Sequence, residues 1–116
     1  MIRTLAAAAL FVAALATPVA NAQSTREVIG WCQDVTAGDY ERGYCEGAFT
    51  AFRGWSRFTL DGEHVIQICL PDEEPVSRLV GAVAAFVEKF PEAEADDFPI
   101  VAHAALRILY PCQPRE

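Results

Sequence analysis

Hydrophobic side chains recur every three to four residues in four stretches of the chain, which is the spacing of one face of an α-helix. Ser24 and Glu27 form a capping-box pattern at the start of the first stretch. Pro91 and Pro111 directly follow the third and fourth stretches and would end those helices. The pattern predicts an all-α fold, a small four-helix bundle-like domain. The expected helices cover residues 24–37, 40–55, 75–90 and 98–110.

The boundaries and inner faces of these helices follow from the same spacing. Gly38 is expected to end the first helix in the left-handed conformation, and Asp39 and Asp97 are expected to cap the second and fourth helices. Gly43 and Gly47 lie one turn apart, which indicates either the close approach of a neighbouring helix or small residues that are simply tolerated. The expected inner faces contain Val28, Trp31, Cys32 and Val35; Tyr44, Ala48, Ala51, Phe52 and Trp55; Val76, Leu79, Val80, Val83, Val87 and Phe90; and Val101, Ala104, Ala105 and Ile108.

Residues 56–68 lack helical spacing. Asp61-Gly62 is a turn signal between two short apolar stretches, residues 58–60 and 65–68. The segment is therefore either a short β-hairpin or an ordered loop between the second and third helices. The sequence EAEADD, residues 92–97, predicts an acidic linker between the third and fourth helices.

The first 22 residues have the pattern of a secretory signal peptide. Arg3 precedes an unbroken apolar run, residues 5–16, and Ala20-Asn21-Ala22 fits a small-residue cleavage site. This run is short of the roughly 20 apolar residues that a membrane-spanning helix needs. We therefore expect cleavage after Ala22, a single mature domain of residues 23–116, and a periplasmic protein that is not inserted into the membrane.

The mature chain is strongly acidic. Without Arg3, the nine basic residues become eight, against sixteen acidic ones, so the formal net charge changes from −7 to −8. Such a charge repels nucleic acid and anionic lipid, and we expect no nucleic-acid partner. The charge favours a basic partner protein, or serves solubility alone.

All four cysteines follow the apolar leader, and an even number is typical of two disulfides in an exported protein. Cys69 stands at the start of the third expected helix and Cys112 at the end of the fourth. The short connection, residues 91–97, would make these helices antiparallel neighbours and bring the two cysteines together. Cys32 and Cys45 similarly flank the first turn between helices. We expect the pairs Cys32–Cys45 and Cys69–Cys112, and the two other connectivities stay open on sequence alone.

The sequence contains no recognisable catalytic or cofactor motif. Paired cysteines do not act as nucleophiles. Ser56, Asp61 and His64 would form a triad only by chance, because no strained elbow or glycine-rich oxyanion motif accompanies them. There is no C-x-x-C, and His64 and His103 stand far from any close cysteine pair. We expect a protein that is not an enzyme and that uses no metal or cofactor.

Two irregular regions are candidate surfaces for a partner protein, because loops on a rigid scaffold commonly carry recognition. One is the segment between the second and third helices, and the other is the acidic linker. For the linker, a solvated turn without a partner is the alternative. The candidate residues are Arg57, Asp61, Glu63 and His64 in the first region, and Glu92, Glu94, Asp96 and Asp97 in the second.

Four short motifs occur in a distinctive order. They are YCEG at residues 44–47, ICLP at 68–71, FPE at 90–92 and AALRILYPC at 104–112. In this order, behind a signal peptide, the chain resembles the type VI secretion amidase immunity family, the Rap/Tai group. The resemblance covers residues 44–112, which is most of the mature chain.

The resemblance implies a periplasmic immunity protein. Members of the group bind a papain-like peptidoglycan amidase delivered by neighbouring cells, often as a homodimer, and occlude its substrate cleft. They perform no chemistry of their own. An acidic inhibitor also suits a cleft with a basic lining.

Two other classes of binding protein stay open on the sequence. One is an acidic periplasmic chaperone that exposes apolar surface when its sixteen acidic residues lose their charge at low pH. The other is a helical domain of the same family that binds a different envelope protein. An enzyme would need a reactive thiol or a bound metal.

Overall fold

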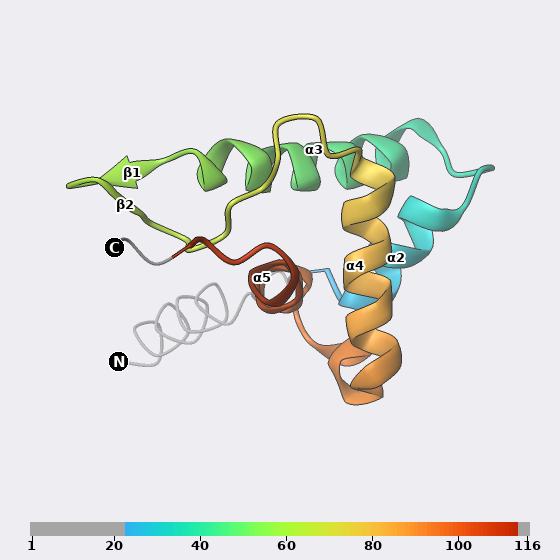
Figure 1. Cartoon of the computed structure of the whole chain (residues 1–116). Helices are drawn as coiled ribbons and strands as arrows, with labels where there is room; N and C mark the ends of the chain where they lie inside the picture. The colour runs from blue at the N-terminus through green and yellow to red at the C-terminus, as the bar shows by residue number, and fades with distance from the viewer. Residues whose placement is uncertain (1–22, 114–116) are drawn as a thin grey trace, which may run out of the picture.

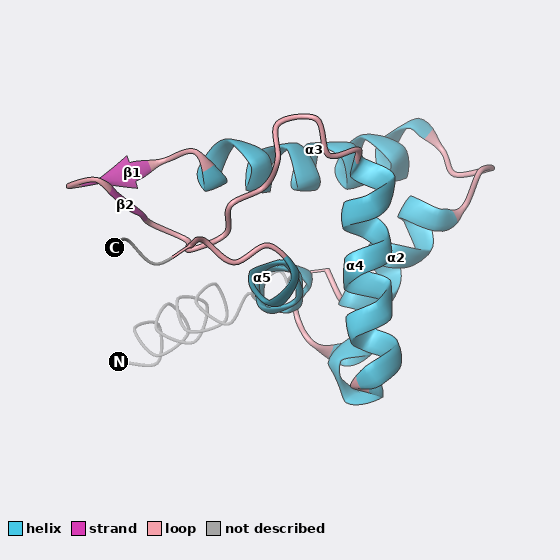
Figure 2. Cartoon of the chain, viewed as in Figure 1, coloured by secondary structure: helices cyan, strands magenta, loops and turns pink. Residues whose placement is uncertain are grey.

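A computed structural model describes residues 23–113, and the expected signal peptide lies outside this range. Within it, the predicted fold class is confirmed: four α-helices are joined by two disulfides, and a short hairpin separates the second helix from the third (Figure 2). The elements in chain order are α2 (Thr25–Gln33), α3 (Asp39–Ser56), β1 (Thr59–Leu60), β2 (Glu63–His64), α4 (Val76–Lys89), the 3-10 helix η1 (Pro91–Ala95) and α5 (Phe98–Leu109).

The helices do not all run along one direction. In Figure 1, α3 runs across the view, α4 runs down from one end of it, and α5 is seen along its own axis beside α4. The expected antiparallel packing of α4 and α5 is therefore wrong. The physical reason is η1, which occupies the connection and turns the chain sideways before α5 begins.

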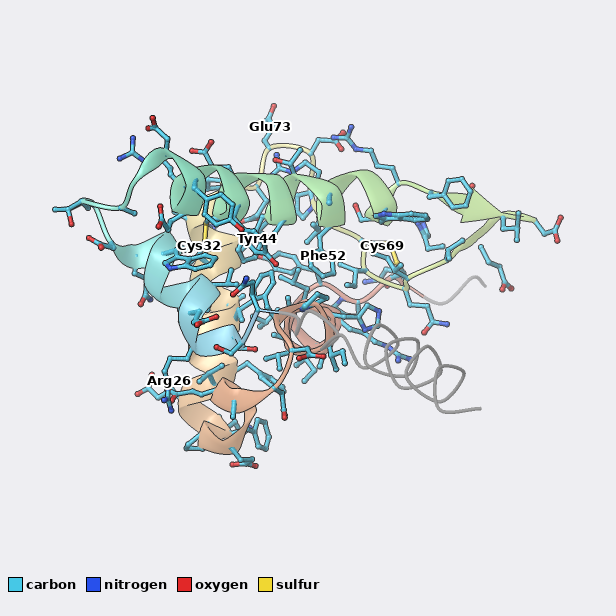
Figure 3. The ribbon with its side chains drawn as sticks, turned by 180° about the vertical axis from the view of Figure 1, so that it is seen from behind. Arg26, Cys32, Tyr44, Phe52, Cys69 and Glu73 are labelled. Carbon is cyan, nitrogen blue, oxygen red and sulfur yellow. A yellow bond between two sulfur atoms is a disulfide. The ribbon has the colours of Figure 1, made fainter. Side chains whose placement is uncertain are left out.

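Both expected disulfides form. The Cα atoms of Cys32 and Cys45 lie 5.4 Å apart, and those of Cys69 and Cys112 lie 4.9 Å apart. The described residues contain no free cysteine. Figure 3 labels Cys32 and Cys69, one from each bridge, and shows that the two bridges stand at different parts of α3. Two intact disulfides are typical of an oxidising compartment outside the cytosol.

The core lies where the four helices meet below α3. Phe49 of α3 and Phe98 of α5 are almost completely buried and pack edge to face, with ring centroids 5.6 Å apart. Tyr44 and Phe52 lie on the same side of α3 and pack partly buried against this core (Figure 3). The other large, fully buried apolar side chains are Val28, Ile68, Leu79, Val83 and Leu106.

The inner face of α3 differs from the expected one. Its buried line runs through Cys45, Phe49 and Ser56, whereas Ala51 and Trp55 are exposed. The disulfide explains the shift, because Cys45 must face Cys32 and residues at helical spacing from Cys45 then face the core as well.

Two other helices also differ from expectation at single positions. Val35 is 91% exposed because α2 ends at Gln33, before the expected face is complete. Ile108 of α5 is 64% exposed, and Leu106 is buried in its place. The contact of Phe98 with Phe49 fixes the rotation of α5 and turns Ile108 outward. The inner face of α4 is largely as expected, except that Phe90 lies just beyond the helix and is exposed.

The turn between α2 and α3 is held by side chains. Gly38 has a φ of −69°, so the expected left-handed helix end is wrong, and Gly38 instead stands before the first residue of α3, Asp39. Thr36 donates from its backbone N and from Oγ1 to Asp34 Oδ1, at 2.9 and 2.7 Å. These bonds lower the pKa of Asp34 from its ordinary value.

The hairpin alternative is correct for residues 59–64. Thr59 pairs with His64 and Leu60 pairs with Glu63 in antiparallel register. Asp61 and Gly62 have φ values of 53° and 80°, as a tight hairpin turn with two left-handed residues requires. β1 lies within the first apolar stretch, residues 58–60, but β2 precedes the second, residues 65–68, which forms no strand.

The glycines of α3 are tolerated small residues, because a Cβ added at Gly43 or Gly47 would meet nothing within 4 Å. We predict that Gly43→Ala and Gly47→Ala each raise the free energy of unfolding by about 0.5–1 kcal/mol, since alanine loses less backbone entropy in a helix. Urea denaturation measures the change. Gly62→Ala is the matched control, and its left-handed φ predicts destabilisation. Destabilisation by either α3 substitution would show that a neighbour does approach this face.

Candidate functional site

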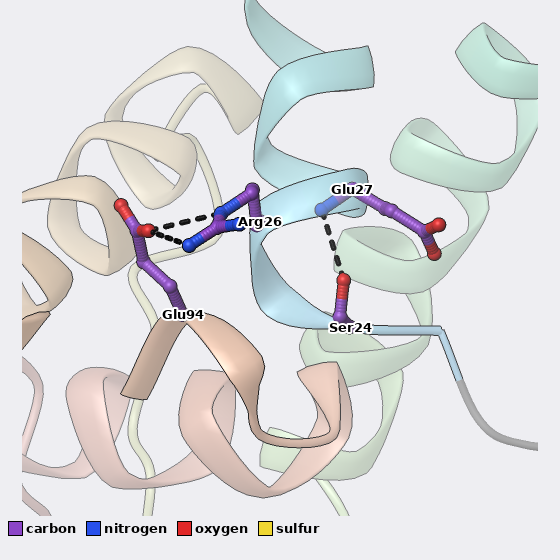
Figure 4. A network of polar contacts seen from close by, with 4 residues as sticks. All are labelled: Ser24, Arg26, Glu27 and Glu94. Carbon is purple, nitrogen blue, oxygen red and sulfur yellow. Dashed lines mark hydrogen bonds and ion pairs between the residues drawn. The ribbon is translucent and has the colours of Figure 1, made fainter. Parts of the chain in front are cut away.

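The acidic linker is anchored to the start of α2. Thr25 donates from its backbone N and from Oγ1 to the carbonyl of Asp96, both at 2.9 Å, and the backbone N of Phe98 donates to the carbonyl of Gln23 at 2.9 Å. Arg26 forms an ion pair with Glu94 at 2.7 Å, and Ser24 Oγ accepts from the backbone N of Glu27 (Figure 4). The expected linker is therefore an ordered segment held in a fixed position.

An apolar groove of about 420 Å³ lies between α4, η1 and α5. Ile100 and Ile108 of α5 are 67% and 64% exposed, and Phe90 at the end of α4 is 40% exposed. Exposed apolar side chains that cluster in this way on a small soluble domain commonly mark an interaction site. We call this feature the acidic-rimmed groove; its lining residues are Phe86, Phe90, Glu92, Ala93, Asp96, Ile100, Val101, Ala104 and Ile108.

The groove combines an apolar lining with two carboxylates. Glu92 and Asp96 line it, and both are exposed. Of the other two acidic candidates, Glu94 pairs with Arg26, and Asp97 stands before the first residue of α5 outside the lining. The arrangement suits an apolar side chain of a partner with basic groups beside it, because the apolar contact supplies affinity and the charges steer association.

The second candidate region lies elsewhere on the molecule. Figure 1 shows the β1–β2 hairpin extending beyond the end of α3, away from η1. Arg57 follows α3 and forms an exposed ion pair with Asp72 at 2.9 Å. Asp61 occupies the hairpin turn, and Glu63 and His64 form β2. The two sets of candidate residues therefore belong to separate surfaces.

A polar cavity of about 460 Å³ lies beside the hairpin. Its lining includes Glu63 and His64 of the hairpin and Arg107 of α5. Cys112, from the Cys69–Cys112 disulfide, also reaches this cavity. Its mixed charges and polar lining are a weaker match to a protein partner than the acidic-rimmed groove.

Ser56, Asp61 and His64 do not have the geometry of a catalytic triad. The Ser56 hydroxyl donates to the carbonyl of Arg53 at 2.7 Å. His64 Nδ1 lies 2.9 Å from the carbonyl oxygen of Ser56 and not from its hydroxyl. Arg53 in turn donates to the carbonyls of Asp72 and Glu74. These contacts hold the hairpin and the segment before α4 against the end of α3.

The structure brings together three side chains that the sequence did not connect. Ligand atoms of His64, Cys69 and Cys112 all lie within 4.8 Å of one another. His64 and Cys69 are five positions apart, and the Cys69–Cys112 pair was expected. The sequence did not show that the hairpin places His64 beside this pair. This cluster lies next to the polar cavity, away from the acidic-rimmed groove.

Comparisons with known proteins found no relative from which a function could be inferred, so the function is argued from the surfaces described above. No family model matches the chain, no curated protein matches it significantly, and no solved structure matches its fold at that level. Across residues 23–113, every helix is too short or too polar to cross a membrane.

Proposed function

We propose that this protein is a periplasmic immunity protein that binds a peptidoglycan amidase toxin delivered by type VI secretion and occludes its substrate cleft. In this role the protein is an inhibitor and performs no chemistry of its own. The periplasmic location, the cleaved signal peptide and the Rap/Tai membership are parts of the same proposal. The observation that carries the binding role is the acidic-rimmed groove, an exposed apolar surface on a scaffold stapled by two disulfides.

The positions of the four motifs support the proposal. YCEG contributes Cys45, ICLP contributes Cys69, and the end of AALRILYPC contributes Cys112. Three motifs therefore supply the scaffold. FPE instead forms the junction of α4 and η1, at the groove.

The charge of the protein also supports a basic partner. Among the described residues, Glu92 and Asp96 make no ion pair with a basic side chain of this chain. Their charges are therefore available to basic groups of a partner. An enzyme cleft with basic residues around an apolar entrance fits this surface.

A capture experiment tests the function. The whole chain is expressed, and the oxidised protein is immobilised and exposed to extract of the producing organism. We expect one papain-like amidase to stay bound through a salt wash and to be inhibited at about equal molar ratio. A parallel column carrying Ile100→Lys should retain much less of it.

Two outcomes contradict the proposal. Retention of many unrelated proteins only at low pH would indicate the acid-activated chaperone. Tight retention of one envelope protein without amidase activity would indicate a binding domain with another role.

A further inference from the structure

We propose that His64, Cys69 and Cys112 bind a zinc ion when the Cys69–Cys112 disulfide is reduced. The proposed metal is Zn²⁺ because two thiolates and one imidazole are ligands that zinc favours, with a water in the fourth position. This inference does not depend on the proposed inhibitor function, since the cluster lies outside the acidic-rimmed groove.

The ligand atoms are already clustered, although the two sulfurs are bonded to each other in the oxidised protein. All three ligand atoms lie within 4.8 Å of one another. In a tetrahedral site with Zn–S bonds of about 2.3 Å and a Zn–N bond of about 2.0 Å, ligand atoms are separated by about 3.5–3.8 Å. Once the sulfur–sulfur bond is broken, side-chain rotations of the two cysteines can increase the distance between the sulfurs to this value without moving the backbone.

The backbone holds the two cysteines together independently of their disulfide. Ile68 and Pro111, the residues next to them, form an isolated antiparallel bridge. The backbone N of Cys69 donates to the carbonyl of Tyr110 at 2.9 Å. While the chain stays folded, these backbone contacts would keep the reduced thiols adjacent.

A hydrogen bond to the backbone fixes the tautomer of His64. Its Nδ1 lies 2.9 Å from the carbonyl oxygen of Ser56, and a carbonyl can only accept a hydrogen bond. Nδ1 therefore carries the proton, and Nε2 keeps a free electron pair for the metal. A ligating histidine whose other ring nitrogen donates to a backbone carbonyl is the usual arrangement around zinc. Ser56 is 3% exposed, so this orienting contact is protected from water.

The polar cavity gives the metal a route from solvent. His64 and Cys112 both line it, together with Glu63, Gln67 and Arg107. Two thiolates neutralise the charge of one Zn²⁺, so binding adds no net charge to the site. The Cys32–Cys45 pair is not part of any such histidine-containing cluster among residues 23–113.

We propose a dithiol as the reductant in the cell. In the test below a phosphine replaces it and is oxidised to the phosphine oxide, with the oxygen taken from water. The dithiol transfers two electrons to the Cys69–Cys112 disulfide and becomes a disulfide itself, while each cysteine sulfur gains a proton. Zinc then binds both sulfurs as thiolates, and the two thiol protons are released to solvent. Cys69 and Cys112 thus link the same two segments in both states, through a disulfide in the oxidised protein and through the metal in the reduced, zinc-bound protein.

Metal titration of the reduced protein tests the proposal. Protein from the expressed whole chain is reduced with a phosphine under anaerobic conditions and titrated with Co²⁺ as a spectroscopic substitute, followed by displacement with Zn²⁺. We expect one Co²⁺ per chain and a thiolate-to-metal charge-transfer band. His64→Ala should weaken binding by at least about tenfold, because a direct ligand is removed.

Three controls make the test specific. His103→Ala removes the other described histidine, which also contacts a backbone carbonyl, and should leave the affinity unchanged. Cys32→Ser/Cys45→Ser should keep the band, and the oxidised protein should lack it. Equal binding by His64→Ala, a band in oxidised protein, or loss of the band in Cys32→Ser/Cys45→Ser would overturn the proposal.

Circular dichroism covers the case in which reduction unfolds the chain. Zinc is then expected to restore the helical signal of the reduced wild-type protein, and not that of reduced His64→Ala. Failure of zinc to restore the wild-type signal would also overturn the proposal.

Discussion

Replacing both cysteines of the Cys69–Cys112 pair with serine is expected to lower the free energy of unfolding by about 4 kcal/mol, the value that the chain-entropy model gives for a loop of this length. The pair closes a sequence separation of 43 residues. Since small domains are stable by only about 5–15 kcal/mol, the variant should lose a large part of its stability. The expected fall in Tm is about 20 °C for a domain of this size.

The matched control is Cys32→Ser/Cys45→Ser, which opens a separation of 13 residues. The same model predicts a loss of about 3 kcal/mol for this shorter loop. Urea denaturation under metal-free conditions measures both variants. If the shorter loop proved the more important one, local packing around Cys45 would outweigh chain entropy, and our ranking would be wrong.

Ile100→Lys is expected to weaken binding of the partner by about 30- to 100-fold, as does truncation of an apolar anchor at the centre of an interface. Ile100 is 67% exposed and lines the acidic-rimmed groove, so the substitution removes an apolar contact and places a positive charge where we expect a basic partner. The free energy of unfolding should change by less than about 0.5 kcal/mol, because the side chain lies at the surface. Calorimetric titration with the captured amidase measures the affinity.

Leu109→Lys is the matched control for this prediction. Leu109 belongs to the same helix and is 55% exposed, but it does not line the groove. Its substitution adds the same charge and should leave the affinity nearly unchanged. Equal losses in the two variants would point to net charge and not to the groove.

Charge reversal is expected to affect binding differently at Asp96 and at Asp97. Asp96→Lys should slow association and weaken binding, because Asp96 lines the groove, while only its backbone carbonyl holds Thr25. Asp97→Lys should have a smaller effect, since Asp97 lies outside the lining. Stopped-flow association at low and high salt distinguishes the two variants. An unchanged association rate in Asp96→Lys would exclude the groove rim from steering.

Local patterns in the sequence were sufficient to predict the four helices and both disulfides, whereas the hairpin was one of two alternatives and η1 was not predicted. The four helices, the turn at Asp61-Gly62 and the pairing of Cys69 with Cys112 each depend on neighbours in the chain or on the order of the helices. The pairing was correct even though the antiparallel packing used to infer it was wrong. The Ile68–Pro111 bridge brings the two cysteines together instead.

Features that depend on the rotation of a helix were not predictable from spacing. Ile108 has the periodicity of a core residue, yet the packing of Phe98 on Phe49 turns it to the surface. The acidic-rimmed groove exists because of that rotation. The acidic candidates Glu92 and Asp96 could be named from the sequence, but their apolar neighbours on α4 and α5 could not.

The contact between Thr25 and Asp96 also sets the order in which the chain can complete its fold. These residues are 71 positions apart, and Ser24 forms a backbone bridge with Asp97. A growing chain can therefore pack α2 on α3 early, but the contacts at the start of α2 form only when nearly the whole sequence has been synthesised. Such late closure of distant contacts slows folding.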